Sequence, residues 1–277
     1  MRTSAIRVMA SGTLLLSSFA LISCGGPSGP QEGTPAFYWD AAKETLGNKD
    51  YTKTLAHLEN ITSTDNEFTA RARPWLLVMT SGMARGYTDL ADSFDAGSHA
   101  NKSNPTDFRR RTNTYRTEAS RMTLEFAEVF DKFQKGKDDP VPLAYPFPTG
   151  SAAPVMPLTK AATGIMLSPA EIETAEKRAI ERGVLLAASD AAGAPDDPAK
   201  ARELLKAGTP QVPRAAFVMT MATTLFNESK LYGSRQIGDP EKVKILCNRA
   251  LDALKTVPET KQTKELSSKI TKSLKAT

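Results

Sequence analysis

The chain has 277 residues, of which 40% are apolar and 24% charged, and this composition is typical of a folded body with one large domain or two small ones. The formal net charge is +5, with acidic residues interleaved among the basic ones, which argues against a nucleic-acid partner. Beyond the amino-terminal region no segment approaches the 18 uninterrupted apolar residues typical of a membrane-spanning helix.

Residues 1–23 have the features of a signal peptide. Arg2 and Arg7 supply a basic start, and an apolar stretch through Leu14, Leu15 and Leu16 follows them. This stretch is short for a membrane span, which needs about 20 residues. We therefore expect residues 1–23 to be cleaved. An ordinary signal peptide with a chance cysteine and an uncleaved anchor helix are the two alternatives.

The tetrad Leu21-Ile22-Ser23-Cys24 at the expected cut resembles the lipobox of bacterial lipoproteins. The resemblance implies that Cys24 becomes the first mature residue and is the lipid attachment site, carrying diacylglyceryl and palmitate-type acyl chains. Gly25, rather than Asp, follows the cysteine. By resemblance to enterobacterial sorting, this favours a lipid anchor in the outer membrane, facing the periplasm.

Removal of the signal peptide also removes Arg2 and Arg7, so the net charge falls to +3 on 254 residues. Residues 24–35 are rich in glycine and proline, and we expect them to form a flexible tether. The remaining residues, 36–277, are expected to form the folded domain.

Apolar residues in this domain recur at intervals of three and four, which predicts amphipathic helices. The stripes start at Tyr38, Tyr51, Leu76 and Ala119, and the clearest comprises Val243, Leu246, Cys247, Ala250, Leu251 and Leu254. The segment around 215–219 suits a helix that is buried on most sides. Apolar and polar residues do not alternate with the period of two that is typical of β-strands, so we predict an all-α fold.

Helix-start signals agree with this prediction. Ser168-Pro169-Ala170-Glu171 has the pattern of a capping box with proline at the first helical position. Asp197-Pro198 and Asp239-Pro240 combine an N-cap acceptor with the same proline placement. Gly193, Gly208 and Gly233 fall where helices should end.

Residues 138–167 form a proline-rich insert, in which a continuous helix is excluded. Tyr145, Phe147, Val155 and Met156 make it more apolar than a typical linker. We expect part of it to pack on the helical body and to border the binding groove. The alternative is a mobile linker between two helical halves.

One pattern, Asp-x-x-Lys at a helix start, recurs at Asp50, Asp197 and Asp239. Each instance follows a helix and a tight turn, and each leads into an apolar stripe, which is typical of stacked antiparallel helix pairs. The run from Gly238 to Leu251 resembles the turn and second helix of the tetratricopeptide repeat, with Ala250 at its small-residue position.

The sequence departs from that repeat at several positions. Lys49 stands where a turn glycine is usual, and Thr54 and Val243 replace an expected alanine. The resemblance implies a tetratricopeptide-like, irregular solenoid, and the alternative is an irregular helical bundle that uses the same capping chemistry.

The sequence contains few candidate catalytic residues, and we predict no catalytic residue, no metal ligand and no cofactor-binding residue. His57 and His99 are the only histidines, His99 being assigned to a loop, and Cys247 is expected to be a buried apolar side chain. The pair Asp89 and Asp92 is assigned to solvated helix surface. A carboxylate pair without a sequence signature remains open.

These patterns favour a lipid-anchored envelope protein that is not an enzyme and that binds a protein or peptide on a helical-repeat surface. The first alternative is a solute-binding accessory protein, resembling the tetratricopeptide lipoproteins associated with TRAP transporters. An envelope enzyme with an unrecognised site is the second.

Overall fold

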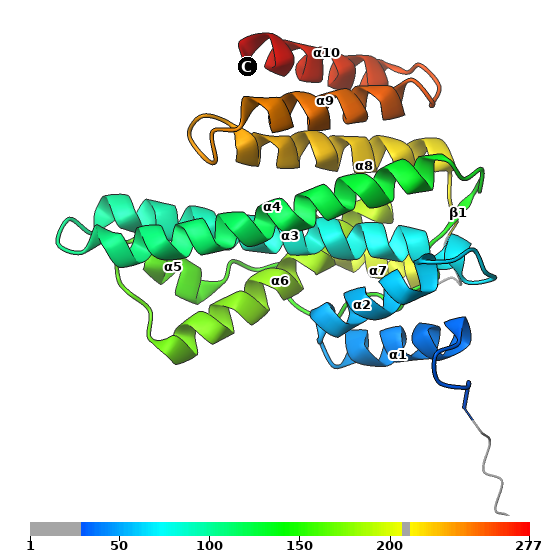
Figure 1. The fold of residues 1–277 in the computed structure, drawn as a ribbon, viewed down its shortest axis with the longest axis horizontal. Coiled ribbons are helices and arrows are strands. Elements are labelled where there is room, and N and C mark those ends of the chain that lie inside the picture. Colours follow the sequence, from blue (N-terminus) through cyan, green and yellow to red (C-terminus); the bar gives the residue numbers. More distant parts are fainter. Residues whose placement is uncertain (1–28, 207–210) are drawn as a thin grey trace, which may run out of the picture.

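The structure is a computed structural model that describes residues 29–206 and 211–277. Within these ranges it contains ten α-helices, one 3₁₀ turn and a single pair of two-residue strands, so the prediction of an all-α fold is confirmed (Figure 1). The predicted signal peptide, Cys24 and Gly208 lie outside the described residues.

The helices follow one another along the chain, most of them with short connections. In chain order the elements are α1 (Pro35–Gly47), α2 (Tyr51–Thr62), α3 (Thr69–Ala100), α4 (Pro105–Gln134), β1 (Val141–Pro142), α5 (Met156–Ala162), α6 (Pro169–Ala191), α7 (Pro198–Lys206), β2 (Gln211–Val212), α8 (Arg214–Ser229), the 3₁₀ turn η1 (Lys230–Tyr232), α9 (Pro240–Leu254) and α10 (Lys261–Ala276).

The long hairpin of α3 and α4 crosses the middle of the molecule, and the other helices pack on its two sides (Figure 1). On one side α8, α9 and α10 are stacked in sequence order. On the other side lie α1, α2, α5 and α6. The first and last helices, α1 and α10, therefore lie at opposite ends of the stack.

Three helix pairs, α1–α2, α6–α7 and α8–α9, share one turn geometry. In each turn a residue with positive φ directly precedes the aspartate, and the Oδ1 atom of that aspartate accepts a hydrogen bond from a backbone N–H three residues later. The φ values are 60° at Lys49, 58° at Asp196 and 76° at Gly238. The distances from Oδ1 to nitrogen are 3.1 Å for Asp50–Lys53, 3.0 Å for Asp197–Lys200 and 3.1 Å for Asp239–Lys242. The predicted N-caps are confirmed, each contributing about 1 kcal/mol.

The predicted buried face of α9 is also confirmed. Five residues of the predicted face have side chains that are at most 5% exposed to solvent: Val243, Leu246, Cys247, Ala250 and Leu254. The Cys247 thiol lies 3.4 Å from the Ser229 hydroxyl of α8, so this cysteine packs as a core side chain.

The proline-rich insert packs on the helical body, as expected. Val141 pairs antiparallel with Val212, and Tyr145 stacks on Trp75 of α3 with ring centroids 5.9 Å apart. Arg182 of α6 donates a hydrogen bond of 3.0 Å to the carbonyl of Ala152.

Two details of the insert differ from the expectation. It contains the short helix α5, in which Pro157 occupies the first turn, where a missing N–H is harmless. Met156 is 74% exposed and does not contribute to the packing.

Helices α3 and α6 cross in close contact at small residues. A Cβ atom added to Gly82 would lie 2.5 Å from the Cα atom of Val184, and one added to Gly86 would lie 2.8 Å from the carbonyl oxygen of Ala179. A Cβ atom on Gly183 would collide with the Gly82 carbonyl oxygen. The two backbones therefore touch directly, and no larger residue fits at these glycines.

We predict that Gly183→Ala lowers the free energy of unfolding by about 3 kcal/mol, because the added methyl group meets backbone atoms that cannot rotate away. Gly47→Ala is the matched control, since nothing lies within 4 Å of a Cβ atom at that helical glycine. Urea unfolding followed by circular dichroism gives both values. Equal stability of the two variants would contradict the assigned crossing.

Candidate binding cavity

A cavity of about 860 Å³ lies between α3, α6 and α8, next to the glycine crossing. Ser81 and Arg85, which directly precede Gly82 and Gly86 in α3, line it together with Ala187 and Asp190, which follow Gly183 in α6. The close approach of α3 and α6 thus fixes two of its walls, and α8 supplies the third.

Ionic contacts hold the charged groups of the α3 and α6 walls in place. Arg85 contacts Asp190 at 3.4 Å and Asp196 at 3.2 Å, so one guanidinium bridges α3 to the turn after α6. Arg182 contacts Asp89 at 2.7 Å. Burial raises the pKa of Asp89 and of Asp190, and the neighbouring arginine opposes this rise in each case.

Asp92 differs from these aspartates because its hydrogen-bond donor is neutral. Its carboxylate accepts a 3.0 Å hydrogen bond from Nε2 of Gln236, which also lines the cavity. Among the described residues no cation lies within 4.0 Å of this carboxylate. Asp92 is an exposed residue, so it places a negative charge at the rim of the cavity.

The α8 wall combines polar and apolar side chains. The lining residues of this helix are Ala216, Met219, Thr220, Met221, Thr223, Thr224, Asn227 and Glu228. Thr223 and Thr224 donate their hydroxyl protons to the carbonyls of Met219 and Thr220. Their oxygen lone pairs are left to accept hydrogen bonds from a ligand.

Glu228 lies where the cavity meets α4. Both of its carboxylate oxygens are fully buried and lack a hydrogen-bond partner among the described residues, and Thr123 of α4 is near enough to lower the pKa of this carboxyl group slightly. Burial raises the pKa of Glu228 well above its usual range. Burial therefore favours the neutral, protonated form of this side chain.

Sequence reasoning missed most of this site. It assigned Asp89 and Asp92 to solvated surface; Asp92 is exposed, whereas Asp89 is half-buried and paired with Arg182, and both line the cavity. It also expected residues 138–167 to border the groove, and this was wrong, because no residue of the insert lines the cavity. The helix around 215–219 is buried on most sides, as predicted: α8 contacts α3, α4, α6, α9 and α10, and only Ala216 and Asn227 of its residues are exposed. The spacing of Thr220, Thr223 and Asn227 along α8 is the signal that could have revealed the wall.

The two histidines lie outside this cavity. His57 packs beside the ring of Tyr38 at a centroid distance of 5.9 Å. His99 belongs to the last turn of α3 and not to a loop, which corrects the prediction. It borders a smaller hollow of about 290 Å³ between α3 and α4 that also contains Asp95 and Arg116, 3.5 Å apart.

A carboxyl pair does occur, between α2 and α4. Burial and the neighbouring Glu59 carboxylate raise the pKa of Glu125 to about 8. Neither side chain lines the cavity or the smaller hollow. The pair is therefore a contact between helices at which Glu125 holds a proton near neutral pH.

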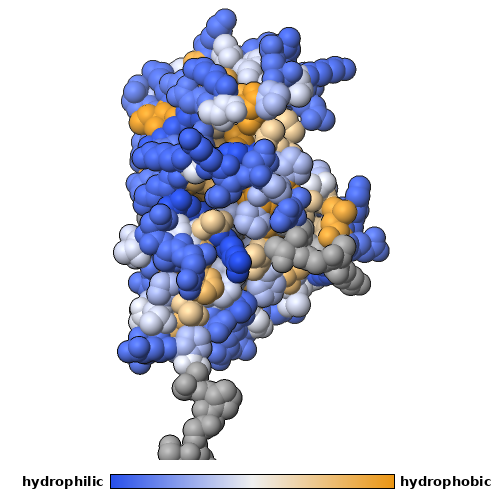
Figure 2. Space-filling view, turned by 90° about the vertical axis from the view of Figure 1, so that its right-hand side faces the viewer, coloured by the Kyte–Doolittle hydropathy of each residue, from blue (hydrophilic) through white to orange (hydrophobic). Residues whose placement is uncertain are grey.

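Hydrophobic side chains are scattered among hydrophilic ones on the face of the molecule shown in Figure 2. The largest exposed ones in the described ranges are Met156, Ile165, Leu204, Ile237 and Ile245, on different elements. The cavity is therefore a better-defined candidate site than any apolar surface.

The sequence matches no known protein-family model and no curated protein. Within residues 29–206 and 211–277, no helix combines the length and apolar character needed to cross a membrane. In the same ranges no three His, Cys, Asp or Glu side chains are grouped as metal ligands.

We predict that Glu125 makes stability fall as pH rises. Its pKa in the folded protein is about 8, above the ordinary value of 4.5. The contribution of this group to the free energy of unfolding is therefore complete below pH 4.5 and is lost as the pH rises through 8. Glu125→Gln keeps a neutral side chain, and we expect it to lose less stability between pH 6 and pH 9 than the wild type. Urea unfolding at both pH values measures the difference.

Glu228 has the same sign of shift, so some slope should remain in this variant. Glu44→Gln, an exposed change on α1, is the control and should follow the wild-type curve, because Glu44 does not contribute to the raised pKa of Glu125. Parallel curves for wild type and Glu125→Gln would show that the carboxyl pair does not form.

Proposed function

We propose that this protein is a lipid-anchored binding protein of the bacterial envelope and that its cavity takes a small solute. The observation that carries the proposal is the cavity of about 860 Å³ with walls from three helices. Small-molecule sites have volumes of about 300–1,000 Å³ and combine apolar surface with a few fixed polar groups. This cavity has that combination, and the proposal assigns it no catalytic step.

The lining indicates which solutes fit. Asp92 and the hydroxyls of Thr223 and Thr224 offer acceptors, while Arg85 is already engaged by Asp190 and Asp196. A ligand with amine or hydroxyl donors satisfies these acceptors, and its carbon skeleton can contact Met219. We therefore propose an amine-bearing solute, such as an amino acid or a polyamine.

The cavity favours the solute-binding alternative over binding of a protein or peptide on a repeat surface. The three shared turns and the resemblance to tetratricopeptide lipoproteins associated with TRAP transporters support the same class, an accessory protein of a transport system. In this proposal Cys24 holds the protein at the outer membrane, facing the periplasm.

We expect Thr220→Trp to abolish solute binding, because the indole would fill the cavity beside α8. Protein purified from its own envelope is first analysed by native mass spectrometry for a retained solute. A thermal-shift screen with amino acids and polyamines follows. The wild type should gain several degrees with a matching amine, and the variant should gain none.

Thr114→Trp on the exposed surface of α4 is the control and should bind as the wild type does. A wild type that neither retains a solute nor responds to any amine would contradict the proposal. Binding that survives in Thr220→Trp would place the site elsewhere.

The anchor has its own test. We expect Cys24→Ala to lose incorporation of labelled palmitate and to leave the membrane fraction or accumulate as a precursor, because the thiol is the acylated atom. Gly25→Asp should keep the label while altering the distribution between inner and outer membranes. Equal labelling of wild type and Cys24→Ala would disprove lipidation at this residue.

A further inference from the structure

Most charged side chains that line the cavity already have an ionic partner. Arg85 contacts Asp190 at 3.4 Å and Asp196 at 3.2 Å. Arg182 contacts Asp89 at 2.7 Å. A ligand gains little from a charge whose partner is already in place, because it has to displace that partner. The charges that select a ligand are therefore the ones that remain without an ionic partner.

One anion and one cation of the lining remain in this state in the described part of the chain. Asp92 accepts a hydrogen bond from the neutral amide of Gln236, and no cation lies within 4.0 Å of its carboxylate. The Lys230 ammonium donates a 2.9 Å hydrogen bond to the neutral amide of Asn227, and it has no carboxylate within 4.0 Å. Burial favours the neutral form of Glu228, the remaining acidic residue of the lining. The cavity thus presents two uncompensated charges of opposite sign.

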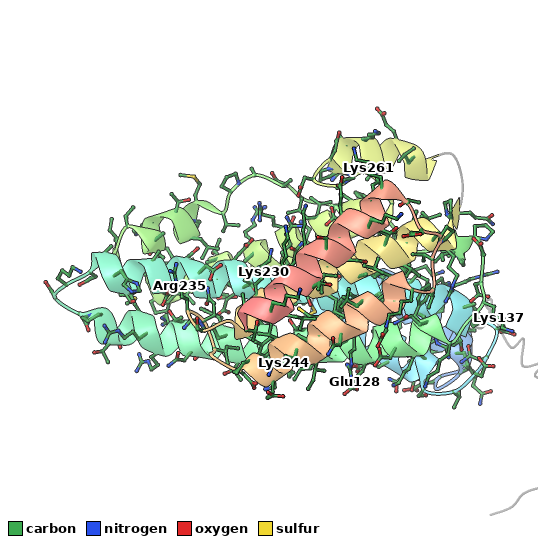
Figure 3. All side chains as sticks on the ribbon, turned by 90° about the horizontal axis from the view of Figure 1, so that it is seen from above. Glu128, Lys137, Lys230, Arg235, Lys244 and Lys261 are labelled. Atoms are coloured by element: carbon green, nitrogen blue, oxygen red, sulfur yellow. The ribbon has the colours of Figure 1, made fainter. Side chains whose placement is uncertain are left out.

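One short segment, between α8 and α9, positions both of these charges. Lys230 begins the 3₁₀ turn η1, and Gln236, the hydrogen-bond partner of Asp92, follows six residues later. The Gly233 amide donates to the Lys230 carbonyl at 3.0 Å, and the Gln236 amide donates to the Gly233 carbonyl at 2.9 Å. Two successive turns of this kind keep the Cα atoms of Lys230 and Gln236 within about 14 Å of each other. Figure 3 labels Lys230 with Arg235 of the same segment, and Arg235 does not line the cavity.

The group around Arg85 favours a second positive charge on the ligand. One guanidinium faces two aspartates, Asp190 and Asp196, so this group has one negative charge in excess. Arg85 precedes Asp92 by seven residues in α3, which places it on nearly the same face of the helix and about 10 Å further along the axis. The lining therefore offers two separated negative regions and one positive side chain.

We propose that the solute is a basic amino acid, bound through its carboxylate at Lys230 and through an ammonium group at Asp92. Its second ammonium group lies towards Asp190 and Asp196. This assignment rests on the proposed solute-binding function and deepens it. A polyamine would place a positive group against Lys230 with no carboxylate to compensate it, and this repulsion selects against polyamines.

Four related compounds test the three charges of the ligand separately. Lysine carries all three, cadaverine lacks the carboxylate, norleucine lacks the side-chain amine, and ε-aminocaproate lacks the α-amine. Isothermal titration calorimetry on the purified full chain measures their affinities. We expect each incomplete compound to bind about fivefold or more weakly than lysine, the scale of one ion pair that water partly reaches. Lys230→Gln should weaken lysine alone to the level of cadaverine and so remove the difference between these two compounds.

The two charge variants have matched controls on the exposed surface. Lys137→Gln is the control for Lys230→Gln, and Figure 3 shows Lys137 well away from Lys230. Asp92→Asn keeps an acceptor for Gln236 but loses the charge, so it should weaken lysine and cadaverine alike. Asp65→Asn is its control. Both controls should bind lysine within about twofold of the wild type.

Equal binding of lysine and cadaverine by the wild type would overturn the amino-acid assignment while the solute-binding cavity would stand, because an amine would still bind there. A preference for lysine that survives in Lys230→Gln would overturn it as well. So would a solute retained by the purified protein that lacks a carboxylate. A wild type that binds none of the four compounds and retains no solute would instead contradict the proposed function, and this assignment with it.

Discussion

Gly82 and Gly86 of α3 allow the backbone of α6 to approach until main-chain atoms touch. Helix axes usually lie about 8–10 Å apart because side chains separate them. At this crossing Gly183 of α6 also has no side chain, so none separates the two backbones. The long helix α3 can then contact α4 on one side and α6 on the other, and both sides of the stack are built on this central unit.

The cavity is a consequence of this crossing and of the residues that follow it. Arg85 of α3, next to Gly86, reaches across to Asp190 and Asp196. Residues on α8 line the opposite wall. A fixed guanidinium and fixed polar groups on α8 form a preorganised site, because neither needs to move when a ligand enters.

Buried carboxyl groups give the fold a pH dependence that its surface charge does not reveal. Glu228 and Glu125 both have raised pKa values, the first through burial alone and the second through burial and Glu59. Each is stable as a neutral acid and destabilises the fold when ionised. The cavity wall at Glu228 and the α2–α4 contact at Glu125 therefore respond to pH in the same direction, although they lie on different helix pairs.

The sequence by itself determined the all-α class, the N-caps at Asp50, Asp197 and Asp239, and the buried face of α9. These features depend on residues three or four positions apart, so a local pattern contains them. The α3–α6 crossing, the role of Asp89 and Asp92 in the cavity, and the pairing of Glu59 with Glu125 were decided only by the tertiary structure. Each joins residues distant in sequence, and a glycine or a carboxylate has the same local pattern on a solvated face as in a helix contact.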